Sequence, residues 1–188
     1  MLRTALLCVL LALTGYAAAE RLTHGFQVWT AEGARRLEVA LRPVPVPPVQ
    51  IEGPGVKRQP LPRWLADSQS VSVVDFVYTR CQTVCLSLGT VFQQMQAQLQ
   101  EAGPGDSAAT RVQLVSISFD PRDGTGDLQA YAKRLRADPR WWRFVRVDGA
   151  PDRQRLLADF QVTVVPDGRG DFEHNAALLV LDGHGRLV

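Results

Sequence analysis

Two cysteines, Cys81 and Cys85, stand four residues apart where a sequence pattern typical of a helix begins. Residues four apart on a helix lie on one face, with Cβ atoms about 5–6 Å apart. The two sulfur atoms can therefore reach either each other or a common metal ion. The spacing is compatible both with thiol–disulfide chemistry and with binding of a soft metal.

The segments around the cysteines predict how they are held. Residues 71–78 form an apolar run typical of a central strand, and a helical pattern begins near Val84. The positive end of that helix stabilises a thiolate. We therefore expect Cys81, just before the first turn, to be the more exposed sulfur and the attacking thiol in any redox chemistry.

The rest of the chain alternates between strand and helix patterns. The predicted strands cover residues 111–119, 143–147 and 176–181, and the predicted helices cover 127–136 and 152–160. A loop at 166–170 precedes the strand at 176–181, and a hairpin turn at 182–185 follows it. This order predicts an α/β fold with a mixed central sheet and helices on both faces.

The region before the first core strand has weaker patterns. Short alternation at 26–29 and 36–41 predicts strands, and the prolines of 43–48 predict an extended connection. Residues 51–62 are rich in Gly and Pro and predict turns, followed by a short helical turn at 61–65.

The N-terminus carries the features of a secretory signal. Arg3 is followed by an apolar run at 6–13 and by small residues at 17–19, which predicts cleavage between Ala19 and Glu20. The apolar run is shorter than an ordinary transmembrane span, and an uncleaved anchor is the alternative. We expect three parts: a signal peptide at 1–19, an N-terminal extension at 20–50 and one domain at 51–188.

The cysteine count and the net charge exclude two further roles for this protein. Cleavage removes Cys8, so the exported chain holds only Cys81 and Cys85. A disulfide between them closes a very small loop and would stabilise the fold little. The net charge of +2 comes from interleaved acidic and basic residues with no basic block, so we do not expect nucleic-acid binding.

Three segments carry a resemblance to a known family: 77–85 with the CxxxC pair, 116–123 and 172–177. Together they resemble the Sco/SenC family of thioredoxin-fold copper-binding proteins, over roughly residues 50–188. By this resemblance, Cys81 and Cys85 fall on the two metal-binding cysteines, and His174 falls on the histidine ligand. Soft thiolates select Cu(I), and imidazole suits either oxidation state of copper.

The resemblance also implies a function, a partner and a location. Family members deliver copper to the binuclear copper site of cytochrome c oxidase, or reduce the cysteines of that site. The implied protein is a periplasmic metallochaperone rather than an enzyme; its partner is the copper-site subunit of the oxidase or another copper or thiol protein. It contacts the membrane only if the N-terminal segment remains uncleaved. The alternative is a thiol–disulfide oxidoreductase that uses Cys81 and Cys85 as a redox pair.

The chain departs from the family pattern in two places. Gln82 and Leu86 stand where the family usually has a proline after each cysteine, which frees backbone N–H groups near the sulfurs. The C-terminal helix that normally follows the final hairpin has no counterpart in the sequence, so we expect the thioredoxin-like fold without it; either the sequence is a fragment or another segment covers that face of the sheet. Of the remaining polar residues, we expect Asp120 and Asp123 to form a turn, with Asp120 close to the site.

Overall fold

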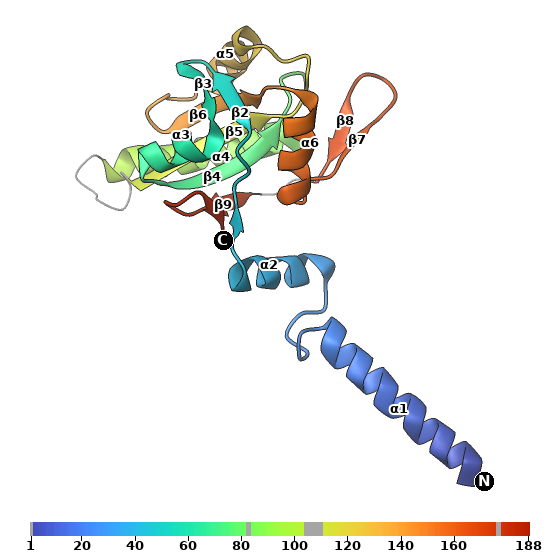
Figure 1. Cartoon of the computed structure of the whole chain (residues 1–188). Helices are drawn as coiled ribbons and strands as arrows, with labels where there is room; N and C mark the ends of the chain where they lie inside the picture. The colour runs from blue at the N-terminus through green and yellow to red at the C-terminus, as the bar shows by residue number, and fades with distance from the viewer. Residues whose placement is uncertain (1, 82–83, 104–110, 176–177) are drawn as a thin grey trace. The chain divides into compact units, whose positions relative to one another are not determined.

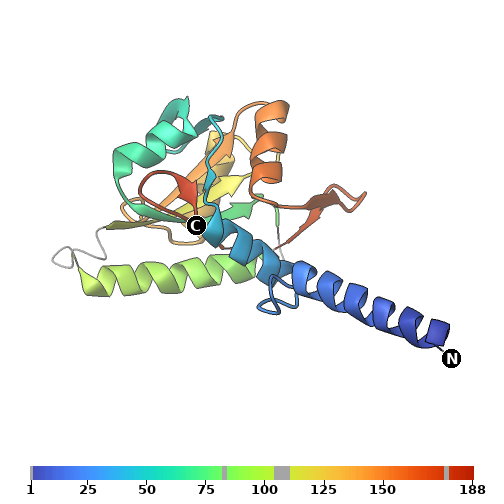
Figure 2. The same ribbon diagram turned by 60° about the horizontal axis from the view of Figure 1, so that its bottom comes forward.

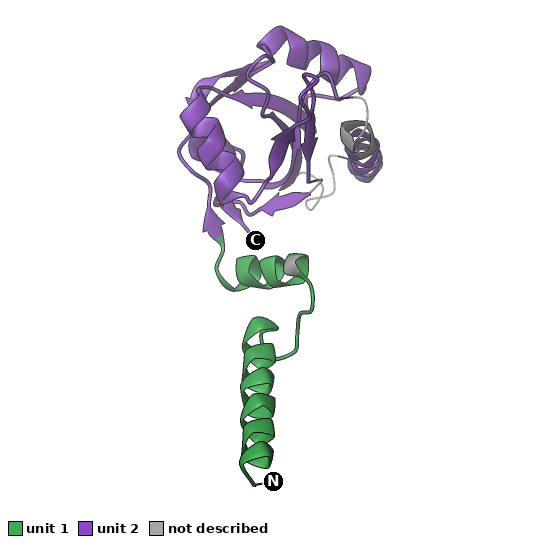
Figure 3. Ribbon diagram, turned by 90° about the vertical axis from the view of Figure 1, so that its right-hand side faces the viewer, with its two compact units in different colours: residues 1–43 green, residues 44–188 purple. Residues whose placement is uncertain are grey.

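The computed structural model describes residues 2–81, 84–103, 111–175 and 178–188. The chain forms two compact units, residues 1–43 and residues 44–188 (Figures 1 and 3). In chain order the elements are α1 (Leu2–Leu22), α2 (Ala31–Leu41), β1 (Val44–Pro45), β2 (Gln50–Gly53), β3 (Val56–Pro60), α3 (Leu61–Ser68), β4 (Val71–Val77), α4 (Val84–Ala102), β5 (Val112–Ser118), α5 (Thr125–Arg134), β6 (Trp142–Val147), α6 (Ala150–Asp159), β7 (Val164–Pro166), β8 (Phe172–His174), β9 (Leu179–Leu181) and β10 (Arg186–Leu187).

The first helix is longer than its apolar run suggested. α1 has 21 residues, none of them buried, and is long and apolar enough to cross a membrane. The expectation that this segment is too short for a span is therefore wrong, because alanines and other small residues extend the helix beyond 6–13. A helix of this kind at the N-terminus fits a signal sequence as well as an anchor.

Residues 36–41 belong to α2, so the strand predicted there is wrong. Thr30 caps the helix, and its hydroxyl accepts a hydrogen bond from the Gly33 N–H at 2.9 Å. Glu32, in the first turn, accepts hydrogen bonds from Arg35 and Arg36. The cap and these ion pairs outweigh the short alternation. Residues 26–29, also predicted as a strand, lie in a turn and a loop.

An eight-stranded sheet forms the centre of the second unit, in the order β1-β10-β9-β4-β5-β6-β2-β3. β4, β5 and β6 run parallel, and β9 lies antiparallel beside β4. The predicted mixed sheet is thus confirmed. The Gly- and Pro-rich segment at 51–62 contributes the hairpin of β2 and β3 as well as turns, because Gly55 takes a φ of +70° between them. The helical turn predicted at 61–65 is the start of α3.

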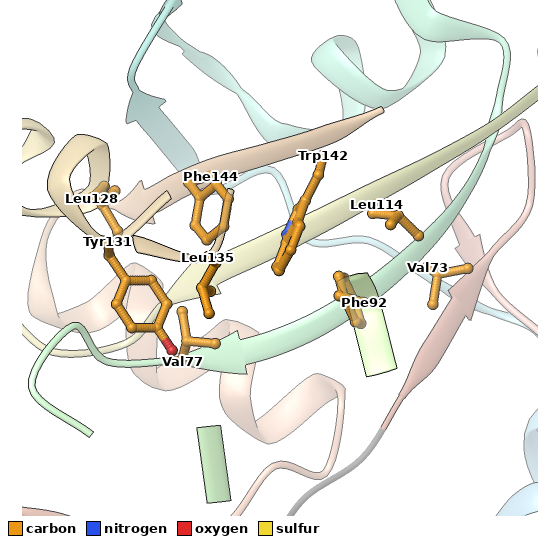
Figure 4. Close-up of a cluster of buried hydrophobic side chains, with 9 residues drawn as sticks. All are labelled: Val73, Val77, Phe92, Leu114, Leu128, Tyr131, Leu135, Trp142 and Phe144. Atoms are coloured by element: carbon orange, nitrogen blue, oxygen red, sulfur yellow. The ribbon is translucent and has the colours of Figure 1, made fainter. Parts of the chain in front are cut away.

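Helices cover both faces of the sheet, as the sequence predicts. Figure 2 shows α4 on one face and α3 and α6 on the other. Under α4 and α5, buried side chains interlock into one cluster, drawn in Figure 4: Val73, Val77, Phe92, Leu114, Leu128, Tyr131, Leu135, Trp142 and Phe144. On the opposite face, Phe160 at the end of α6 packs edge-on against Phe76, with ring centroids 6.2 Å apart.

The parallel strands determine where loops meet. The segments that follow β4 and β5 leave the sheet at the same edge, because parallel strands end together. The first segment contains Cys81 and the second contains Asp120. β7 and β8 form a separate two-stranded sheet, which ends at His174.

Candidate functional site

The cysteine loop, residues 78–81, follows β4 and precedes α4, as predicted. The Cys81 N–H donates to the Tyr78 carbonyl at 3.1 Å, which turns the chain back at the strand end. Cys81 is buried, with 5% of its surface exposed, and its rank as the more exposed of the two sulfurs stays a prediction. Cys85 lies in the first turn of α4, and its side chain is outside the described part of the structure.

Tyr78 connects the cysteine loop with the hairpin of β7 and β8. Its hydroxyl donates to the Phe172 carbonyl at 3.2 Å and also lies against the Cys81 side chain. Burial, followed by this contact with Cys81, raises the pKa of Tyr78 to about 12. One phenol therefore contacts the first cysteine and the strand that carries His174.

His174 lies in an aromatic cluster with Tyr78, Phe119 and Phe172. The imidazole centroid is 5.3 Å from the Phe119 ring and 6.5 Å from the Tyr78 ring, both in edge-to-face geometry. Phe119 and Tyr78 in turn lie 5.5 Å apart. Since Tyr78 contacts Cys81, the structure brings two of the three predicted ligands, Cys81 and His174, to one tyrosine.

His174 lies outside the central sheet. The strand predicted at 176–181 does lie beside the cysteine strand, because β9 (Leu179–Leu181) pairs with β4. His174 itself ends β8 and pairs with Val164. Gly168 and Gly170 take φ values of +75° and +99°, and these conformations allow the predicted loop to close as a hairpin.

Asp123 anchors the cysteine loop. Its carboxylate accepts hydrogen bonds from the Thr79 N–H at 2.9 Å, the Thr79 hydroxyl at 2.6 Å and the Ser118 hydroxyl at 2.6 Å. The carboxylate is buried at the ends of β4 and β5. Asp123 was predicted only as a turn former, because a sequence does not show which distant backbone a carboxylate binds.

Asp120 forms a second anchor, as its predicted position near the site suggested. Its side chain has no exposed surface and accepts hydrogen bonds from Arg80 at 2.5 Å and Arg122 at 2.9 Å. Burial alone would raise the pKa of Asp120, but the hydrogen bonds from Arg122 and Arg80 outweigh it and hold that pKa below its usual range. Arg80 directly precedes Cys81, so this ion cluster borders the cysteine loop.

Asp75 is a buried acid that sequence reasoning missed. Neither of its carboxylate oxygens has a hydrogen-bond partner among the described residues. Burial raises its pKa to about 7, and Ser116, its own backbone and the charge of His174 oppose that rise only in part. A single acid within the apolar run 71–78 was the signal that could have identified it.

The proposed ligand set is only partly described. Among the described residues, no three His, Cys, Asp or Glu side chains are close enough to hold a metal ion, and the Cys85 side chain is outside that description. His184 is exposed in the turn before β10. The convergence on Tyr78 therefore brings together Cys81 and His174, and Cys85 is placed by its backbone in the first turn of α4.

Comparisons with known proteins identify the family and the fold. The SCO1/SenC family model matches residues 68–188, and no curated protein matches the chain. The solution structure of apo Sco1 from Thermus thermophilus is 30% identical, with a TM-score of 0.53 over 79% of this chain and 81% of that chain. Bradyrhizobium japonicum ScoI with copper bound is 22% identical, with a TM-score of 0.59 over 77% and 87%. BsSco is 20% identical, with a TM-score of 0.63 over 78% and 81%; it is described as having a disulfide switch and as a Sco-family cytochrome c oxidase assembly protein.

Proposed function

This chain belongs to the SCO1/SenC family, and from that premise we propose that it is an exported copper-binding protein. In this proposal it delivers copper to the binuclear copper site of cytochrome c oxidase, or helps that site to mature. The observation that supports it most is the contact of Cys81 and His174 with the same tyrosine. These two residues are 93 positions apart in the sequence, and each would be a copper ligand.

Cys81, Cys85 and His174 would hold the copper ion as cargo. Thiolates bind Cu(I) well, and imidazole binds copper in either oxidation state. Three protein ligands leave room for a thiol of the partner protein to enter, as a carrier needs for transfer, whereas a closed four-ligand site would favour retention. The positive end of α4 favours the thiolate form of a cysteine at its first turn.

The proposed location is the periplasm. An apolar helix at Leu2–Leu22 supports export, either as a cleaved signal or as an anchor in the inner membrane. In both cases the domain with the cysteines would lie on the side where an oxidase copper site is assembled. Membrane contact would then depend on whether α1 is retained.

The second candidate function is thiol–disulfide exchange. It is favoured by the placement of Cys85 at the start of α4 after a sheet strand, and by the disulfide switch described for BsSco. In that function the cysteines would shuttle electrons, while His174 would only adjust a thiol pKa. Copper binding would not be needed.

Copper binding by the full chain in detergent, and by its His174→Ala variant, separates the two functions. We expect one copper per chain in the parent protein, with thiolate-to-Cu(II) absorption that is lost or strongly altered in His174→Ala. His184→Ala is the matched control, because it removes an exposed imidazole from a turn. Equal copper binding without His174, together with measurable disulfide exchange, would favour the oxidoreductase instead.

A further inference from the structure

We propose that Arg122 is a positioning residue that, besides Tyr78, ties the hairpin of β7 and β8 to the cysteine loop and thereby holds His174 in place for copper. This inference rests on the proposed function. It extends that function by naming a residue outside the ligand set that determines how well the ligands converge.

Arg122 bridges two separate parts of the fold. On one side its Nε lies 3.0 and 3.1 Å from the two Asp120 carboxylate oxygens, and its Nη2 lies 2.9 Å from Oδ2. On the other side the same Nη2 donates to the Gly170 carbonyl at 2.5 Å. The guanidinium carbon also lies 5.5 Å from the Phe172 ring centroid, within the range of a cation–π contact.

The Asp120 end of this bridge is rigid. The Asp120 side chain has no exposed surface, and Arg80 binds the same carboxylate from the cysteine loop. The Arg122 N–H also donates to Oδ1 at 2.9 Å, so the turn that carries Arg122 is fastened to the same acid. Arg122 therefore extends from a buried anchor that also contacts the residue before Cys81.

The hairpin end, in contrast, depends on such contacts. β7 and β8 share no strand pairing with the main sheet in the described structure, and an isolated two-stranded hairpin is marginally stable in water. Gly170 lies two positions before the start of β8, and Phe172 and His174 lie on the same side of that strand because side chains alternate. A contact that fixes Gly170 and Phe172 thus fixes the direction in which His174 points.

The chemistry of the bridge favours arginine specifically. A guanidinium group presents several N–H donors in one plane, so it can bind a carboxylate and a carbonyl at the same time. A lysine at this position would have a single ammonium group and could not reproduce both contacts with the same geometry. We therefore expect Arg122→Lys to lose part of the copper affinity that depends on Arg122.

The test compares Arg122→Gln with Arg169→Gln in the full chain in detergent. Both changes remove one positive charge near the hairpin. Arg169, however, is exposed, and among the described residues it forms no hydrogen bond with Asp120. We expect Arg122→Gln to weaken Cu(II) binding about tenfold, as for loss of one charged hydrogen bond at a half-exposed site. Arg169→Gln should change it less than threefold.

Two further measurements isolate positioning. Hydrogen exchange of the segment 164–175 in the metal-free protein should become faster in Arg122→Gln, while exchange in β4 and β5 stays unchanged. In the His174→Ala background, Arg122→Gln should have no further effect on copper binding, because its effect passes through that imidazole.

The outcomes distinguish this inference from the proposed function. If His174→Ala weakens copper binding but Arg122→Gln matches Arg169→Gln in affinity and hairpin exchange, the positioning role is wrong and the copper function stands. An equal Arg122→Gln effect with and without His174 also overturns the positioning role. If the parent protein binds copper independently of His174, the proposed ligand set fails. Hydrogen exchange of the hairpin in Arg122→Gln then tests whether Arg122 holds the hairpin. Faster exchange supports that contact, and unchanged exchange overturns it.

Discussion

Asp123 gives the most direct test of how the cysteine loop is held. Its carboxylate accepts three hydrogen bonds, two from Thr79 and one from Ser118. A hydrogen bond to a charged group contributes about 1.5–3 kcal/mol. Asp123→Asn keeps one acceptor oxygen and replaces the other by a donor, so at least one buried donor loses its partner. We expect the free energy of unfolding to fall by about 2–4 kcal/mol.

Urea denaturation followed by circular dichroism measures this loss. Asp67→Asn is the control, because Asp67 is exposed on α3 and its change should cost less than about 0.5 kcal/mol. Copper affinity measured below the transition should also fall, since Thr79 lies two residues before Cys81. A loss for Asp123→Asn no larger than that of the control would refute the view that these three hydrogen bonds hold the loop.

Two further substitutions test buried polar groups near the site. The folded chain keeps the Asp75 proton to about pH 7, whereas an ordinary aspartate releases it near 3.8, so stability should fall as pH rises through that window. The stability of Asp75→Asn should not fall in this way. In urea denaturation, its free energy of unfolding relative to that of the parent protein should therefore rise by roughly 2–3 kcal/mol between pH 5 and pH 8. A difference that stays constant with pH would contradict a neutral Asp75. Tyr78→Phe keeps the ring contacts with Phe119 but removes the hydroxyl shared by Cys81 and Phe172, so Cu(II) titration should give a several-fold weaker affinity. Equal affinity in this variant would mean that the hydroxyl does not organise the site.

The core elements of the second unit were predictable because each has a strong local pattern. The apolar run before Cys81 is β4, and the helical pattern that begins near Val84 is α4. The later alternation of strands and helices is also confirmed, with ends shifted by a few residues. Local patterns predict these elements because a strand or helix with one buried face needs apolar residues at the same spacing in any fold of this class.

The failures lie where a local pattern is short or where the pairing partner is distant. Residues 36–41 alternate like a strand, yet a cap at Thr30 and ion pairs of Glu32 make them helical. Residues 164–174 pair into a hairpin only because Gly168 and Gly170 can adopt positive φ values. Neither outcome follows from hydrophobic alternation alone.

The sequence by itself determined the chemistry available to this protein: two cysteines at helical spacing, a distant histidine, and the strand and helix that flank the cysteines. Tertiary structure decided which side chains meet. Tyr78 and Phe172 are 94 positions apart, Arg122 and Gly170 are 48 apart, and Thr79 and Asp123 are 44 apart. Such contacts depend on the order of strands in the sheet and on hydrogen bonds between distant loops, which residue types and local spacing do not specify.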